Sequence, residues 1–230
     1  MIIGRGASRA EKRFKSLTRL LIEKLKEAIV IGQLAPGVQL VEAELAASLK
    51  VGPVALREAL RALEAEGYVT FRSDNHVVVT KPTREEIEDY YTIAGVLEGL
   101  AARLAVERAR PEEIERLREL HQSLREACQK RDLVGYFDAN NRFHRFIAEI
   151  ACNERLYRLV DQLRQEMQKT RILALRLPQR LQYSMREHDQ ILDAFLKKNP
   201  ELAESTVVRH LRNQMETLHK ALDATKGDNR

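Results

Sequence analysis

The chain has 230 residues, of which 44% are hydrophobic and only 5% aromatic, with no tryptophan. This length allows two compact domains, and the composition favours helices packed through leucine, alanine and isoleucine. The two cysteines, Cys128 and Cys152, are too few for a disulfide framework in a chain of this size, so free thiols are expected. No apolar stretch approaches the roughly 20 residues that span a bilayer, and no hydrophobic signal core begins the chain, which predicts a cytoplasmic protein.

The net charge of +5 comes from 39 basic and 34 acidic residues, and the excess is concentrated near the N-terminus. We interpret residues 1–16 as a basic arm. Such an arm is either a solvated tail or a source of sequence-independent, salt-sensitive contacts to phosphate groups. The charged residues among positions 1–19 are Arg5, Arg9, Lys12, Arg13, Lys15 and Arg19, opposed by Glu11.

A helix is predicted from Leu17 to Ile31, because apolar residues recur there at helical spacing. Its predicted buried stripe is Leu20, Leu21, Ile22, Leu25, Ala28 and Ile29. Residues 31–37 then form a loop.

Two short helices are predicted next. The first has an apolar face of Leu45, Leu49 and Val51 and ends before Pro53. The second begins at Pro53, because the first turn of a helix has no partner for the N–H that proline lacks. It ends at Gly67, which can take a left-handed conformation. The predicted buried positions of the second helix are Leu56, Ala59, Leu60 and Leu63, and the predicted exposed face is Val54, Ala55, Glu58 and Arg61, with Arg57 beside it.

Residues 68–71 and 77–80 are β-rich runs separated by the polar residues 73–76, a pattern typical of a hairpin. Two helices followed by a hairpin indicate a winged helix-turn-helix over residues 17–80, which makes double-stranded DNA the expected partner. The segment resembles the GntR family of bacterial transcription regulators. The residues that carry this resemblance are Glu44-Leu45-Ala46, Val51, Leu56-Arg57-Glu58-Ala59-Leu60 and Leu63-Glu64-Ala65-Glu66-Gly67-Tyr68-Val69.

The resemblance implies that the second helix enters the major groove and that the wing tip lies near the minor groove. Arg57 would then contact phosphate or a base edge, where arginine can bond guanine in a bidentate manner. Val54 and Ala55 stand where many relatives carry threonine or arginine, and His76 stands where the wing often has glycine. The expected DNA-contacting residues are Arg57, Val54, Ala55, Arg61, Arg72 and His76.

Residues 83–225 predict an all-helical domain for effector binding and dimerisation, separated from the first by Lys81-Pro82. Its first helix begins with a capping box formed by Thr83 and Glu86. The expected fold is therefore mainly α: a winged helix-turn-helix followed by a helical bundle. The predicted core face of the first helix is Tyr90, Ile93, Ala94, Leu97, Leu100, Ala101 and Leu104, and further helices are predicted over residues 112–129, 132–151, 154–175, 179–197 and 201–222.

Three histidines fall on inward faces of three of these helices. Asn140 and His144 share one face, and His188 and His210 sit in apolar stripes further along. A bundle can assemble a metal site in its core from such positions, and neutral imidazole binds zinc or nickel well. Equally, a histidine on an apolar face can be a core residue bonded to a neighbour. The remaining histidines, His76, His121 and His219, are expected to be solvated.

The pattern Asn140-Asn141-Arg142-Phe143-His144, then Glu187-His188 and His210, resembles the ligand-binding (FCD) domain of the FadR branch of GntR regulators. That resemblance implies a divalent transition metal held by Asn140, His144, His188 and His210, which in turn binds an organic acid. Asn140 replaces the usual aspartate. Ala94 stands where relatives that sense carboxylates often carry arginine. The expected effector-binding residues are Ala94, Arg171 and Gln214, with Arg176 as a further candidate cation.

The predicted function is a non-enzymatic, homodimeric, DNA-binding regulator whose operator binding a metabolite controls. One alternative is a regulator that senses the metal itself. A metal-dependent hydrolase is a second alternative, because a catalytic zinc site keeps an open position for water, but no His-Glu-x-x-His run or evident general base is present.

Overall fold

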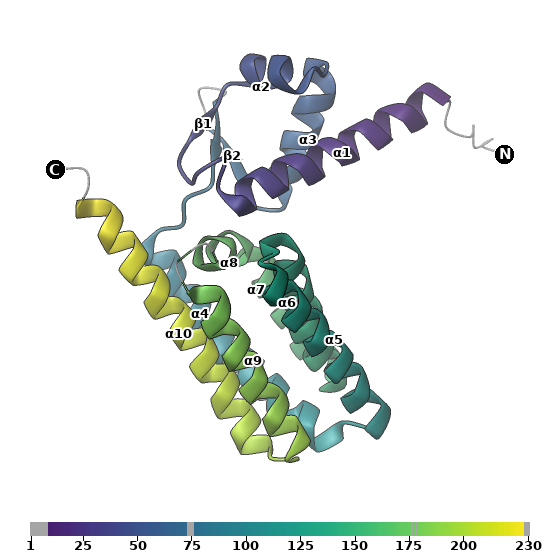
Figure 1. Cartoon of the computed structure of the whole chain (residues 1–230), viewed down its shortest axis with the longest axis vertical. Helices are drawn as coiled ribbons and strands as arrows, with labels where there is room; N and C mark the ends of the chain where they lie inside the picture. The colour runs from purple at the N-terminus through teal and green to yellow at the C-terminus, as the bar shows by residue number, and fades with distance from the viewer. Residues whose placement is uncertain (1–8, 73–75, 176, 178, 228–230) are drawn as a thin grey trace. The chain divides into compact units, whose positions relative to one another are not determined.

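The computed structural model describes residues 9–72, 76–175, 177 and 179–227. The chain divides into two compact units, Met1–Lys81 and Pro82–Arg230. Both are built mainly of helices, and the small sheet belongs to the first unit (Figure 1). The predicted fold class, a winged helix-turn-helix followed by a helical bundle, is confirmed. No helix in the described ranges is both long and apolar enough to cross a membrane.

In its described residues, the first unit contains three helices and a three-stranded antiparallel sheet of order β1-β3-β2. Strands β2 and β3 form the predicted hairpin, in which Thr70 pairs with Val78. Strand β1 adds to the other edge of β3. The elements are α1 (Arg9–Ile31), β1 (Gln39–Leu40), α2 (Glu42–Leu49), α3 (Pro53–Ala65), β2 (Val69–Phe71) and β3 (Val77–Val79).

Helix α3 begins and ends where the sequence predicts. Gly52 is its N-cap in an extended conformation and Pro53 occupies the first turn. Gly67 has a φ of +78°, the left-handed conformation that a side chain would strain. The predicted core positions Leu56, Ala59, Leu60 and Leu63 are all fully buried.

Helix α1 differs from the prediction at both its start and its buried face. It begins at Arg9, so residues 9–16 of the predicted basic arm belong to a helix, whereas residues 1–8 lie outside the described residues. Leu20 is 53% exposed, and Val30 is buried instead. The buried positions Leu21, Leu25 and Ile29 are spaced by four residues, which leaves Leu20 on the opposite side of the helix.

The second unit is a bundle of seven helices within its described residues (Figure 1). Thr83 and Glu86 form the predicted capping box: the Glu86 N–H donates to Oγ1 of Thr83, and the Thr83 N–H donates to the Glu86 carboxylate. The helices are α4 (Arg84–Arg108), α5 (Pro111–Lys130), α6 (Leu133–Ile150), α7 (Glu154–Glu166), α8 (Gln168–Leu175), α9 (Arg180–Leu196) and α10 (Pro200–Gly227).

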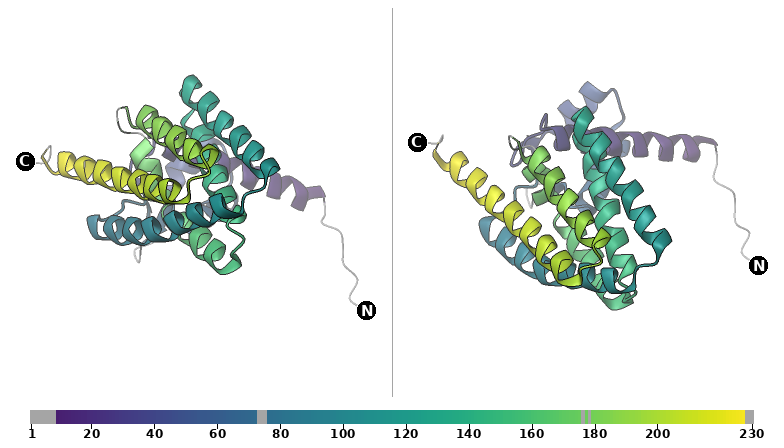
Figure 2. Two further views of the ribbon diagram at one scale, coloured as in Figure 1. Left: turned by 90° about the horizontal axis from the view of Figure 1, so that it is seen from below. Right: turned by 60° about the horizontal axis from the view of Figure 1, so that its bottom comes forward.

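Helices α4 and α10 lie side by side along much of their length (Figure 2). Small residues on α4 allow this approach, since a Cβ added to Gly99 would lie 2.8 Å from the Val208 side chain. The predicted core face of α4 was wrong in part: Ile93 and Leu100 are exposed. Helix α4 also packs against α6 and α7, so its alanines and glycines are buried on more than one side. The spacing of its large apolar residues alone therefore does not identify its buried surface.

The helix predicted over residues 154–175 is two helices, α7 and α8, separated at Met167. The Thr170 hydroxyl donates to the Met167 carbonyl at 2.7 Å, in competition with the backbone pattern of a continuous helix. The Thr170 Oγ1 also lies 3.2 Å from the buried Tyr91 hydroxyl. This break turns the chain where Arg171 enters the core.

Candidate metal centre and DNA-reading surface

Three histidines from three helices meet in the core of the bundle. His144 lies on α6, His188 on α9 and His210 on α10, and each is at most 3% exposed. One nitrogen from each ring lies within 4.8 Å of the others. The sequence prediction that these three helical faces converge is therefore reproduced by the structure.

Each histidine has an acceptor beside its Nδ1, which leaves Nε2 as the nitrogen that could bind a metal. Nδ1 of His144 lies 2.9 Å from Oε2 of Glu98, and Nδ1 of His210 lies 2.6 Å from Oε2 of Glu187. Nδ1 of His188 lies 2.7 Å from the Ser184 carbonyl oxygen. Because these partners are acceptors, each Nδ1 carries the hydrogen and each Nε2 keeps its lone pair.

The Nε2 atoms of His144 and His188 are only 3.1 Å apart. Two lone pairs at this distance repel unless a proton or a cation lies between them. Imidazoles that donate through one nitrogen to a carboxylate or carbonyl, with the other nitrogen free, are the usual arrangement of histidine metal ligands. The donor set therefore fits a borderline metal ion such as zinc or nickel.

Burial keeps the three rings neutral, as metal ligands must be. It lowers the pKa of His144 to about 3, assisted by the Arg164 charge. Burial also lowers the pKa of His188 well below its usual value, and the pKa of His210 is lowered for the same reason despite the opposing effect of Glu187.

The two carboxylates behind the histidines remain ionised. Burial opposes the charge on Glu98, but Arg164 and His144 outweigh it, so the Glu98 pKa is lowered. Burial likewise opposes the charge on Glu187, yet hydrogen bonds from His210 and Arg180 bring its pKa to about 2. Neither Glu98 nor Glu187 was predicted as a site residue. A charged residue at an inward position of a predicted core helix is the sequence feature that could have indicated each of them.

Asn140 borders the triad, but not as predicted. Its Nδ2 lies 2.9 Å from Nε2 of His188, and its Oδ1 accepts hydrogen bonds from Arg164, at 3.1 Å, and from Arg171. The amide oxygen, the atom expected to bind a cation, thus faces two guanidinium groups. The opposite orientation of the amide would place an NH₂ group against those two donors, so the arginines determine which way it points.

Three arginines lie buried near the triad, and one of them, Arg171, is a predicted effector-binding residue. Arg171 is 4% exposed and donates to Asn141 at 2.6 Å. Arg164 donates to both Glu98 oxygens at 2.7 Å. Arg180 donates to the two oxygens of Glu187 at 3.1 and 2.8 Å. The other predicted effector residues, Ala94 and Gln214, are buried, and Arg176 lies outside the described residues.

Two histidines expected in solvent are instead packed. His121 is 5% exposed, and its Nε2 lies 2.9 Å from Oδ1 of Asp189 on a neighbouring helix. His219 is also partly buried, 3.7 Å from Glu88. Both helices face more than one neighbour, which a single apolar stripe does not reveal. His76 in the wing is exposed, as predicted.

One hollow borders His144, and a second borders Arg164, the partner of Glu98. The one bounded by Glu98, His144, Val160 and four further residues is too small for a water molecule. The second has a volume of about 210 Å³ and opens between α6 and α7. Its charged lining consists of Arg142, Arg145, Arg164 and Asp161.

The exposed face of α3 carries half of the predicted DNA-contacting residues, namely Val54, Arg57 and Arg61. Val54 is 71% exposed, and Arg57 is half-exposed, 4.0 Å from Glu42. The prediction that Ala55 contacts DNA is wrong, because Ala55 is buried against α1. Successive residues of a helix point about 100° apart, so Ala55 faces away from the exposed side on which Val54 lies.

Arg61 and the wing residues complete this face. The Arg61 guanidinium lies 3.7 Å from the centre of the Phe71 ring and donates to Glu64 at 2.8 Å. Arg72 and His76 are exposed, and the Arg72 N–H donates to the His76 carbonyl at 2.8 Å, which closes the described part of the hairpin. Residues 73–75 at the wing tip lie outside the described residues.

A winged helix-turn-helix followed by a helical domain defines the class of DNA-binding transcriptional regulators, and comparison with known proteins gives the family. Residues 17–79 match the bacterial regulatory proteins of the gntR family, and residues 89–213 match the FCD domain. The chain therefore belongs to the GntR family of transcriptional regulators, with an FCD effector-binding domain.

Its relatives span nearly the whole chain. The uncharacterized HTH-type transcriptional regulator YdhC of Bacillus subtilis is 28% identical over 207 residues, which cover 88% of this chain and 91% of that protein. A probable D-xylose utilization operon transcriptional repressor of Paenarthrobacter nicotinovorans is 29% identical over 203 residues, covering 86% and 88%. The structure of McbR/YncC from E. coli is similar with a TM-score of 0.67 at 23% identity, covering 90% of this chain and 98% of that one.

Proposed function

We propose that this regulator binds a divalent transition metal through His144, His188 and His210, and that the metal centre controls operator binding. The observation that carries the proposal is the shared environment of the three rings: each Nδ1 lies beside an acceptor, so each Nε2 is the nitrogen left to bind a metal. When bound, the metal supplies a Lewis-acid centre with positions open to an oxygen ligand. The chain's own residues keep the rings neutral and oriented.

The proposed effector is a small organic acid that binds beside this centre. Its support is the 210 Å³ hollow, in which three arginines face one aspartate. Arg164 links this hollow to the histidines, because it also donates to Asn140 and to Glu98, the partner of His144. An acid that engages Arg164 would compete with these contacts, so its binding and the orientation of His144 are energetically coupled.

The alternative of a regulator that senses the metal itself has its own support. The hollow next to Glu98 and His144 has no room for water, so a metal-bound acid requires the surrounding side chains to move. Operator affinity measured with metal alone and then with metal plus citrate separates the two functions.

The proposal includes a homodimer, since a two-fold symmetric protein matches a near-palindromic operator. Ile93, Val96 and Leu100 form an exposed apolar stripe on α4, and Val96 is 67% exposed. We expect this stripe to contact the partner subunit. Val96→Glu should then convert the dimer to a monomer in light-scattering chromatography. Leu196→Glu, at an exposed apolar position on α9, is the control and should remain dimeric. A dimeric Val96→Glu protein would exclude this interface.

The test of metal control is operator affinity under three conditions: chelator-treated protein, protein with zinc or nickel, and metal-loaded protein with citrate. A change with metal that His188→Gln abolishes supports the metal centre, and a further change with citrate supports the acid effector. His121→Gln is the matched control, because His121 is also buried in this bundle but lies outside the triad. If operator affinity of the unsubstituted protein is the same with and without metal, the proposal is refuted.

A further inference from the structure

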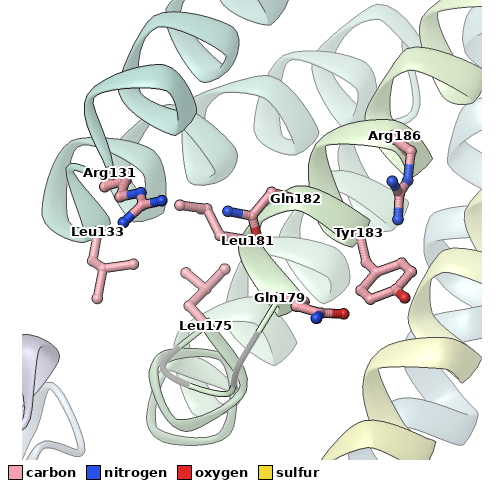
Figure 3. Close-up of a pocket in the computed structure, with 8 residues that line it drawn as sticks. All are labelled: Arg131, Leu133, Leu175, Gln179, Leu181, Gln182, Tyr183 and Arg186. Atoms are coloured by element: carbon pink, nitrogen blue, oxygen red, sulfur yellow. The ribbon is translucent and has the colours of Figure 1, made fainter.

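A further cavity lies apart from the histidine triad, where the turn between α5 and α6 faces the end of α8 and the start of α9 (Figure 3). Its volume is about 710 Å³, within the range of small-molecule sites. None of its lining residues is a histidine of the triad or one of the carboxylates that hold them. The lining residues are Arg131, Leu133, Leu175, Gln179, Leu181, Gln182, Tyr183 and Arg186.

Part of the wall of this cavity is apolar. Leu133 comes from the first turn of α6, Leu175 from the last turn of α8 and Leu181 from the first turn of α9. Leu175 and Leu181 are largely buried, each 6% exposed, and both line the cavity. Three leucines from three helices favour a ligand with a hydrocarbon body.

The rim is positively charged. Arg131 and Arg186 are both exposed, and the eight lining residues include no acid. Figure 3 shows the Arg131 side chain directed toward Leu181 and Gln182, with Tyr183 and Arg186 together at the other end. The Arg186 guanidinium stacks on the Tyr183 ring, 4.5 Å from its centre, an arrangement that orders the side chain and leaves its N–H edge available for a ligand.

The nearest acid in sequence, Asp132, is already engaged. Its Oδ1 accepts the Gly135 N–H at 2.9 Å as the N-cap of α6. Arg131 itself is fixed by the end of α5, where it takes a left-handed conformation with a φ of +54° and its N–H donates to the Cys128 carbonyl. The backbone thus places the Arg131 charge at the rim, while the adjacent carboxylate serves the helix terminus.

We propose that this cavity is a second ligand site, distinct from the metal centre, for an amphipathic anion: a molecule with one carboxylate or phosphate group and an apolar body. The leucines cover the body, the arginines bind the anionic group, and the amides of Gln179 and Gln182 bind its polar substituents. The site does not depend on the metal, because no residue of the metal centre contributes to it.

The probe is octanoate, measured by calorimetry on the full-length protein, with octyl phosphate, octanol and acetate as comparisons. Octanoate should bind more tightly than acetate, which lacks the apolar body, and than octanol, which lacks the charge. Octyl phosphate binding more tightly than octanoate would assign the site to phosphate, and the reverse would assign it to carboxylate.

Variants at the rim locate the binding. Arg131→Gln and Arg186→Gln should each weaken octanoate binding about tenfold, the effect of one lost charge-assisted hydrogen bond. Gln182→Trp, at an exposed position, should fill the cavity and abolish binding without unfolding the protein. Arg155→Gln, at an exposed arginine on α7, is the control and should bind normally.

Chelator treatment separates this site from the metal centre. Octanoate binding that persists after metal removal supports the second site, and binding lost with the metal overturns it. Equal affinity for octanol and octanoate, unchanged binding in all three rim variants, or no binding up to the solubility limit would each also overturn it.

Discussion

The side chain at position 140 provides a quantitative test of the metal centre. Asn140→Asp should increase metal affinity, because the Asn140 Nδ2 that now lies 2.9 Å from Nε2 of His188 becomes a carboxylate oxygen beside the proposed ion. Two unit charges about 4 Å apart attract by about 4 kcal/mol at an effective dielectric constant of 20. Arg164 and Arg171, which contact the same side chain, offset much of this attraction.

A net gain of about 1–3 kcal/mol remains, the usual strength of a hydrogen bond or contact to a charged group, and it corresponds to roughly 5- to 150-fold tighter binding. Tighter binding to the folded state also adds more stability at a given metal concentration. Metal should therefore raise the melting temperature of the variant by more than that of the unsubstituted protein.

The assay is competition of the protein with a fluorescent zinc chelator. Asn141→Asp is the matched control: it adds the same charge one residue away, where the side chain contacts Arg171 rather than His188, and should change zinc affinity much less. Equal or weaker zinc binding by Asn140→Asp, or an equal gain in both variants, would refute the assignment of the centre.

Three further predictions concern the buried ion pair, pH and DNA. Arg164→Met should lower the unfolding free energy by about 3–5 kcal/mol in chemical denaturation, because it leaves Glu98 buried without its main cation. Arg145→Met removes a half-exposed ion pair and should lower the unfolding free energy by less than about 1 kcal/mol. Similar losses in the two variants would contradict the assigned role of burial. In metal-free protein, the His144 pKa of about 3 lies below the unfolded value of about 6.5, so the unfolded chain binds the proton first as the pH falls. The free energy of unfolding should therefore decrease as the pH is lowered below 6.5. A free energy of unfolding that increased toward pH 5 would contradict this prediction. Arg57→Ala should weaken operator binding about tenfold and lower its salt dependence. Fluorescence anisotropy with the operator and with a random duplex measures both effects. Unchanged affinity for both duplexes would show that Arg57 does not contact DNA.

Local signals predicted the first domain well. The start of α3 at Pro53 and its end before Gly67 depend on backbone constraints of those residues alone, and both were confirmed. Ala55 was misassigned because a small residue fits equally on a helix surface or against a neighbouring helix, and only the packing of α1 decides between them.

The convergence of His144, His188 and His210 was also predictable, because each lies in an apolar stripe of its own helix. The orientation of Asn140 was not, since it depends on Arg164 and Arg171, which reach it from α7 and α8 across the bundle. Periodicity within one helix contains no information about a charge supplied by another. The same reasoning explains the buried His121, whose partner belongs to α9.

X-ray absorption at the zinc edge on the zinc-loaded protein would show whether the three histidines bind one metal ion together. We predict one zinc per chain with three imidazole nitrogens at about 2.0–2.1 Å, and loss of this signature in His188→Gln but not in His121→Gln. Zinc coordinated by fewer than two imidazoles, or an identical spectrum from His188→Gln, would contradict a metal centre built on these three residues.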